Sequence, residues 1–130
     1  MEITWKYTTP ISEKSIANVE QVYHVQIPEE LKTIIKKGNN GVPSKRYFDT
    51  NRSKEHEIKT LLSYDRSDME NVYSAFEVLK EIDCKLLPFA NDPAGNLICY
   101  DGSKVVYWHH ETDEVEPVAD SISEFFDKLY

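Results

Sequence analysis

The sequence predicts a single α+β domain over residues 1–130, on three observations. Apolar residues recur at helical spacing in the first third, in the middle and at the C-terminus. Apolar strand-like segments joined by a tight turn occupy the last third. The 130 residues are 40% hydrophobic and 29% charged, without a linker, an internal repeat or a low-complexity stretch. Such a chain can bury one core without a disulfide or a metal.

Two helices are expected near the N-terminus. Ser12 can cap the first, whose apolar positions follow at spacings of three and four residues: Ile16, Val19, Val22 and Tyr23. The second begins at Pro28, has two glutamates at its positive end and ends at Gly38. Residues 39–43 combine Asn, Gly and Pro and predict a tight turn.

The middle of the chain predicts two strands and a third helix. Tyr47–Phe48 and Ile58–Tyr64 are the strand candidates, and the polar run between them predicts an exposed loop. Ser67 and Glu70 have the spacing of a capping box at the start of the helix. The buried face of that helix is expected to comprise Met69, Val72, Tyr73, Phe76 and Leu79.

The C-terminal third predicts sheet followed by a helix. Leu86–Phe89 is a strand that its proline confines to an edge or a bulge. Leu97–Tyr100 and Val105–Trp108 form a hairpin that turns at Asp101-Gly102. A second capping box, which starts at Ser121, predicts a last helix with Ile122, Phe125, Phe126 and Leu129 on its apolar face.

Charge is unevenly distributed along the chain. The net charge is −8, and the region from residue 92 to the end has nine acidic residues against two lysines. Residues 32–59, by contrast, have eight basic and three acidic residues. The negative total argues against nucleic acid or an anionic membrane as the main partner. The acids either solvate an ordinary surface or form a patch that attracts a basic protein.

The cysteines and the N-terminus predict a cytoplasmic protein. Cys84 and Cys99 show neither a Cys-x-x-C motif nor a Cys/His ligand spacing. We therefore expect two buried thiols in a reducing compartment, with no zinc site and no cofactor. The first residues lack the basic and apolar regions of a signal peptide, and no segment has the roughly 18 apolar residues of a membrane span.

Two histidines and two aspartates are candidates for metal binding or acid–base catalysis. Neutral imidazoles bind metals and act as general bases, but His109 and His110 are adjacent on a strand and point to opposite faces. Asp92 and Asp101 would form an acid–base pair only if the fold brought them together, and Asp101 already has a role in the turn. A hydrolase using Asp92 and His109 is one hypothesis, although no nucleophile or phosphate-binding motif accompanies them.

Four segments resemble, in order, the motifs of the SUKH superfamily, also known as the Smi/Knr-type domain. They are I-P-E-E-L with N-N-G-V-P (27–31 and 39–43), L-P-F-A-N-D-P-A-G-N with a later Asp (87–101), V-V-Y-W-H-H-E (105–111) and V-A-D-S-I-S-E-F-F (118–126). The likeness spans Ser12 to Leu129. Asn40 stands where the family usually has glycine, and Asn tolerates a positive φ.

The resemblance implies a central, mostly antiparallel sheet with helices packed around it, and a non-enzymatic role. Many bacterial members of the superfamily are immunity proteins that neutralise toxins, often nucleases, whereas fungal relatives help regulate cell-wall synthesis. The leading hypothesis is an immunity protein that occludes the basic domain of a cognate toxin with an acidic surface. Its partner-binding candidates, with the tryptophan as aromatic anchor, are Asp92, Asp101, Trp108, Glu111, Asp113 and Glu114.

The alternative hypothesis is a regulatory or scaffold module. Such a module would bind host proteins or a small ligand through the loop near Asn91–Asn96. The sequence leaves the oligomeric state open.

Overall fold

A five-stranded antiparallel sheet forms the centre of the computed structural model, which describes residues 3–82 and 85–130. The strands lie in the order β5-β6-β7-β8-β9, and their bounds are Thr60–Leu61, Leu87–Asn91, Leu97–Tyr100, Val105–Trp108 and Val115–Ala119. Two short antiparallel pairs accompany the sheet: β1 (Trp5–Lys6) with β2 (Val42–Pro43), and β3 (Tyr47–Phe48) with β4 (His56–Glu57). The predicted central antiparallel sheet is confirmed.

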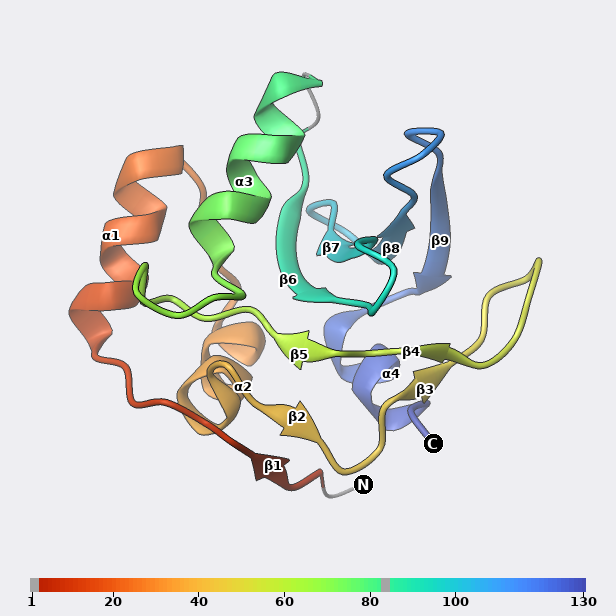
Figure 1. The fold of residues 1–130 in the computed structure, drawn as a ribbon, viewed down its shortest axis with the longest axis horizontal. Coiled ribbons are helices and arrows are strands. Elements are labelled where there is room, and N and C mark those ends of the chain that lie inside the picture. The colour runs from red at the N-terminus through yellow and green to blue at the C-terminus, as the bar shows by residue number, and fades with distance from the viewer. Residues whose placement is uncertain (1–2, 83–84) are drawn as a thin grey trace.

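Four helices pack around the sheet in the described residues, as Figure 1 shows: α1 (Glu13–Tyr23), α2 (Glu29–Gly38), α3 (Val72–Glu81) and α4 (Ile122–Asp127). α1 and α3 lie side by side, and the rings of Tyr23 and Phe76 stack between them with centroids 4.2 Å apart. α4 contacts β9 and α2. The α+β class predicted from the sequence is therefore confirmed.

The local signals at the helix ends act as predicted in α1, α2 and α4. The Ser12 hydroxyl accepts a hydrogen bond from the Ser15 backbone N–H (3.2 Å), and the Ser121 hydroxyl accepts one from the Glu124 N–H (3.0 Å). α2 ends at Gly38, and Asn40 in the turn that follows has a φ of 63°. Asn adopts this left-handed conformation at low cost, which explains how it replaces glycine there.

The predicted start of α3 is wrong. The helix begins at Val72, and the cap is Asn71, whose side chain accepts a hydrogen bond from the Ser74 N–H (2.9 Å). Ser67 instead donates its hydroxyl to the Asp65 carboxylate (2.8 Å) within the preceding loop. Met69 consequently lies outside the helix and is 91% exposed, so it is no part of the core.

The predicted hairpin of β7 and β8 is confirmed. Leu97 pairs with Trp108 and Tyr100 with Val105, and the Asp101 carboxylate accepts the Ser103 N–H (2.9 Å) in the turn. For β6 the sequence predicted either an edge strand or a bulge at its proline, and the bulge is confirmed. The strand has a register shift next to its proline, but it lies inside the sheet between β5 and β7, not at an edge.

Two further strands differ from the prediction. Within 58–64, only Thr60–Leu61 pairs in the sheet. Strand β9 was not predicted, because Glu116 and Pro117 interrupt its apolar character. Pro117 is compatible with β9 because this strand lies at the edge of the sheet.

The core lies between the sheet and the helices and is rich in aromatic rings. Phe48 contacts Tyr107 and Phe125 with centroids 5.4 Å and 5.5 Å apart, and Phe125 lies 5.8 Å from Phe89. Cys99 is buried on β7, whereas Cys84 lies outside the described residues. Of the apolar positions predicted for α1, Ile16 and Val19 are buried, whereas Val22 is 51% exposed.

Candidate functional site

Three of the predicted contact residues lie together on the loop between β8 and β9. The loop is a tight turn in which the His109 N–H donates to the Glu114 carbonyl (2.9 Å) and the Asp113 N–H donates to the His109 carbonyl (2.8 Å). Asp113 has a φ of 60°, so its backbone is in the left-handed region. This turn leaves Glu111, Asp113 and Glu114 exposed on one short segment.

The basic segment of the chain reaches this acidic loop. The Arg52 guanidinium forms an ion pair with the Glu114 carboxylate, and both side chains are about half exposed. The hydrogen bond and the negative charge of Glu114 raise the pKa of Arg52. Within the described residues Glu111 and Asp113 form no ion pair, so their charges face solvent uncompensated by a direct partner.

A second charged contact lies at the base of the same loop. The His109 Nε2 atom is 2.5 Å from the carboxylate of Glu116, whose side chain is 9% exposed. Burial acts to raise the pKa of Glu116, but hydrogen bonds from His109 and Thr50 and the charges of His109 and Arg52 outweigh it, so the pKa is lowered. His110 takes no part in this pair; its backbone N–H donates to Asn96 (3.0 Å).

Asp92 is buried and is not a surface contact, contrary to the expectation. Its carboxylate accepts the N–H groups of Ala94 (3.0 Å) and Asn96 (2.8 Å), the Asn96 side-chain amide (3.0 Å) and the Tyr107 hydroxyl. Burial, and then the hydrogen bond and charge of Asp92, raise the pKa of Tyr107. The acidic side chain therefore closes the 91–96 loop against β8 and leaves few polar groups of that loop for a ligand.

Trp108 is also buried, so the expectation of an exposed aromatic anchor is wrong. Its side chain is on β8, all four residues of which are buried between β7 and β9. The whole residue is 3% exposed. Its indole Nε1–H is buried, and no acceptor for it exists in residues 3–82 and 85–130.

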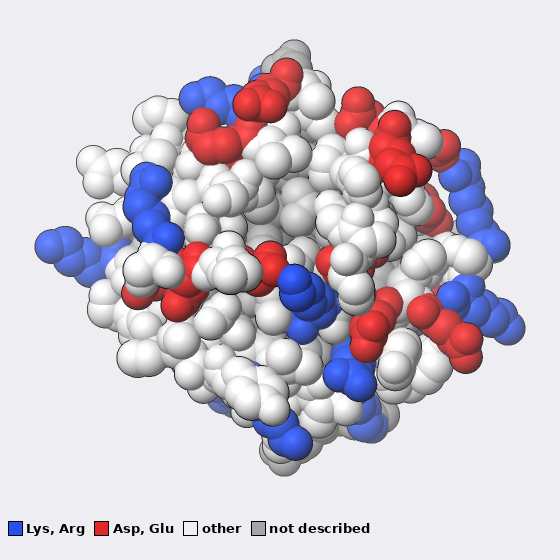
Figure 2. All heavy atoms as spheres, viewed as in Figure 1, with Lys and Arg blue, Asp and Glu red and all other residues white. Residues whose placement is uncertain are grey.

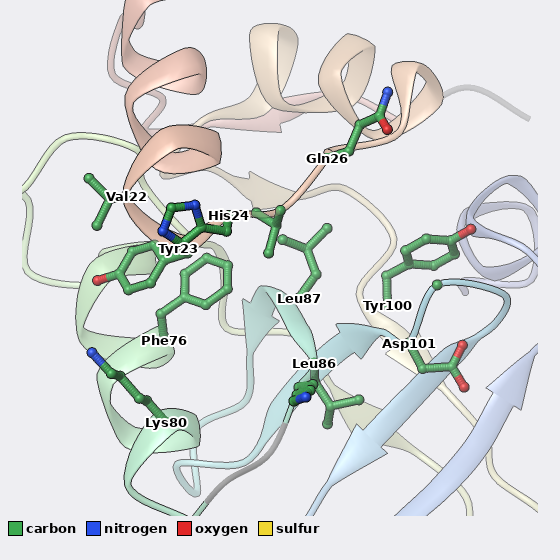
Figure 3. A pocket seen from close by; sticks show the side chains of 13 residues that line it. Val22, Tyr23, His24, Gln26, Phe76, Lys80, Leu86, Leu87, Tyr100 and Asp101 are labelled. Atoms are coloured by element: carbon green, nitrogen blue, oxygen red, sulfur yellow. The ribbon is translucent and has the colours of Figure 1, made fainter.

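Asp101 lies apart from the other candidates. It is in the turn at the opposite end of the β7–β8 hairpin from the acidic loop, since Tyr100 pairs with Val105 and Leu97 with Trp108. There it borders a groove of about 660 Å³ between α1, α3 and the start of β6. Figure 3 shows Tyr100 and Asp101 on the opposite side of this groove from the α1 and α3 residues. The six predicted residues thus do not form one surface.

The hydrolase hypothesis requires Asp92 and His109 to meet, and the fold separates them. Tyr107 lies between the two: its hydroxyl donates to Asp92, and its ring centroid is 4.7 Å from that of His109. His109 borders a small pocket of about 290 Å³ on the acidic loop, but Asp92 does not. In the described part of the chain, no three His, Cys, Asp or Glu side chains are grouped to hold a metal ion.

Arg52 and Glu116 were not among the residues predicted from the sequence. The partner of Arg52 is 62 residues away, which leaves no local signal. Glu116 lies on β9, a strand that was not predicted, so the sequence carried no signal for its contact with His109.

The comparison with protein families decides the identity of this fold. Residues 10–128 match the SMI1/KNR4 family (SUKH-1). The chain belongs to this family. The match covers nearly the whole chain, so the resemblance seen in the sequence is confirmed. SUKH members are known as toxin immunity proteins. A comparison with curated proteins gave no match.

Of the six predicted contact residues, Glu111, Asp113 and Glu114 are the three that are exposed together on the acidic loop. None of the helices in residues 3–82 and 85–130 is long and apolar enough to cross a membrane.

Proposed function

We propose that this chain is a cytoplasmic immunity protein that binds a cognate toxin and neutralises it without catalysing a reaction. The family match supports the general role. The observation that carries the finer proposal is the exposure of Glu111, Asp113 and Glu114 on one turn between β8 and β9. These carboxylates form the acidic surface that covers a basic domain of the toxin.

Charge explains how such a surface would act. A nuclease toxin needs Lys and Arg to bind phosphates, so its active face is basic. An acidic loop attracts that face over distances up to about a Debye length and raises the association rate. Once bound, the loop and its surroundings occupy the positions that phosphates would take. Inhibition follows from occlusion alone.

Co-expression tests the role directly. The toxin domain encoded beside the gene for this chain should arrest growth alone and should not do so when this chain is present. Charge reversal of all three loop carboxylates, Glu111→Lys, Asp113→Lys and Glu114→Lys, should restore the arrest. Asp101→Lys is the single-site control, because it reverses one charge at the far end of the β7–β8 hairpin. Failure of the wild-type chain to protect would contradict the proposal.

A further inference from the structure

A hollow of about 360 Å³ opens beside the acidic loop, on the face that Figure 2 shows. We call it the α3 hollow. Met69, Ser74 and Val78 line it on the α3 side, and Leu97, Trp108 and His110 line it on the sheet side. His110 also lines the small pocket on the acidic loop, so the two depressions adjoin. A partner bound to the loop would therefore also reach the hollow.

Two exposed apolar side chains line the α3 hollow. Met69 is 91% exposed, the highest value among the large hydrophobic residues described, and Val78 is 45% exposed. Adjacent exposed apolar side chains mark interaction sites more often than single ones do. Methionine is well suited to such a site because its flexible thioether adapts to the shape of a partner.

Trp108 supplies an independent observation at the same place. Trp108 is among the residues that line the hollow, and its indole Nε1–H is buried without an acceptor among the described residues. Buried donors almost always have a partner in native proteins, so each exception needs an explanation. This nitrogen is closed off from the hollow in the unbound chain, so a carbonyl of a bound molecule reaches it only after neighbouring side chains move.

The charges around the hollow indicate the chemistry of its occupant. On the α3 side the Glu70 carboxylate lies 2.5 Å from the Lys59 ammonium and accepts the Asn91 amide (2.7 Å), so its charge is compensated. On the loop side Glu111 and Asp113 form no ion pair within the described residues. Arg66 and Glu77 border a pocket that shares Asn71 and Ser74 with the hollow, and their charges are of opposite sign. The net charge beside the hollow is therefore negative, which favours a basic segment.

We infer that the α3 hollow receives an apolar side chain from a basic segment of the toxin. Glu111 and Asp113 contact the Lys or Arg residues of this segment, and once neighbouring side chains move, the Trp108 indole donates to one of its carbonyls. This inference rests on the proposed function and names the surface that the partner occupies. The acidic loop then sets the association rate, while the hollow holds the bound segment.

Two valines of similar exposure form a matched pair for the test. Val78 is 45% exposed on α3 at the hollow, and Val22 is 51% exposed on α1 at the separate groove. With a toxin domain that the wild-type chain neutralises, Val78→Lys should raise the Kd by about tenfold or more. Val22→Lys should change it by less than about twofold. Equal Kd values for the two variants would overturn the inference and leave the proposed function standing.

A second arm tests the hollow without the toxin. The probes are short synthetic peptides with one Leu, Phe or Trp flanked by Lys and Arg, and a matched set flanked by Glu. The indole N–H resonances of Trp5 and Trp108 are distinguished with Trp5→Phe, and basic peptides should shift that of Trp108 in wild type but not in Val78→Lys. No shift with any basic peptide, or an equal shift with the acidic set, would overturn the inference. If no toxin is neutralised, the proposed function fails, and this arm still decides whether the hollow takes a basic segment.

Discussion

Arg52 and Glu114 are 62 residues apart in the sequence and form an ion pair at the edge of the β8–β9 loop. The pair joins the basic segment of the chain to its acidic end, so the charge imbalance along the sequence is partly cancelled in space. Arg52 thereby limits the negative charge that the loop presents. The strength of the acidic surface is set by one arginine as well as by its carboxylates.

Removal of Arg52 should strengthen electrostatic attraction to a basic partner. In Arg52→Gln the Glu114 charge is no longer compensated, so we expect faster association at low salt and a steeper decrease with ionic strength. The free energy of unfolding should change little because the pair is exposed. Stopped-flow kinetics with a neutralised toxin domain measures the rate. Arg46→Gln is the control, since Arg46 pairs with Glu57 elsewhere (3.2 Å); the same increase in both variants would refute the local effect.

Asp92 should be a stability residue. Asp92→Ala leaves two backbone N–H groups, the Asn96 amide and the Tyr107 hydroxyl without their acceptor. We expect a loss of about 2–4 kcal/mol in urea unfolding. Asp101→Ala, which removes the turn acceptor at the exposed end of the hairpin, should cost about 1 kcal/mol or less. Equal losses for the two variants would show that the buried network contributes little.

The ionised carboxylate of Glu116 should stabilise the folded state at neutral pH and lose this effect in acid. Its folded pKa lies below the ordinary value of 4.5, so the folded state keeps the carboxylate ionised to a lower pH than the unfolded state does. The resulting stabilisation is present above about pH 4.5 and is lost as the pH falls through the folded pKa. Glu116→Gln should therefore be less stable than wild type above that pH, and the difference should shrink below it. Urea unfolding of both proteins at several acidic pH values measures this difference in unfolding free energy. A difference that stays the same at every pH would contradict the prediction.

A second variant tests the cause of that shift. Hydrogen bonding from Thr50 is one of the contributions that lower the pKa of Glu116. Thr50→Val should therefore weaken the acid dependence without abolishing it, because His109 keeps its contact with Glu116 (2.5 Å).

Gly38 is required by its contact with Trp5. A Cβ at position 38 would overlap the Trp5 indole ring, which packs on the last turn of α2. Gly38→Ala should cost about 1–3 kcal/mol of stability. In a Trp5→Leu background the same substitution should cost less, and urea unfolding of the four proteins in this cycle gives the coupling. A cost that is equal in both backgrounds would show that the ring is not the cause.

Features set by local chemistry could be predicted from the sequence. Ser12 and Ser121 cap helices because their hydroxyls meet N–H groups three residues on. The β7–β8 hairpin follows from Asp101-Gly102, where Gly102 has a φ of 101° that most other residues disfavour. In these cases the interacting groups are neighbours in the chain.

Features set by distant neighbours could not be predicted. The acids that follow Trp108 favour an exposed position, yet the residue lies on an inner strand of the sheet and is buried. Asp92 belongs to an acidic region but is enclosed by Asn96 and Tyr107. The acidic loop itself was predicted in part: Glu111, Asp113 and Glu114 lie together, whereas Asp101 lies at the far end of the hairpin.

The association rate of a neutralised toxin domain, measured against ionic strength, tests the central proposal most directly. Wild type is compared with the triple variant Glu111→Lys, Asp113→Lys and Glu114→Lys, whose substitutions lie on the exposed turn and leave the buried network intact. We predict slower association and a flatter salt dependence for the variant. Identical rates and identical salt dependence in the two proteins would contradict the proposal that this loop is the surface that meets the toxin.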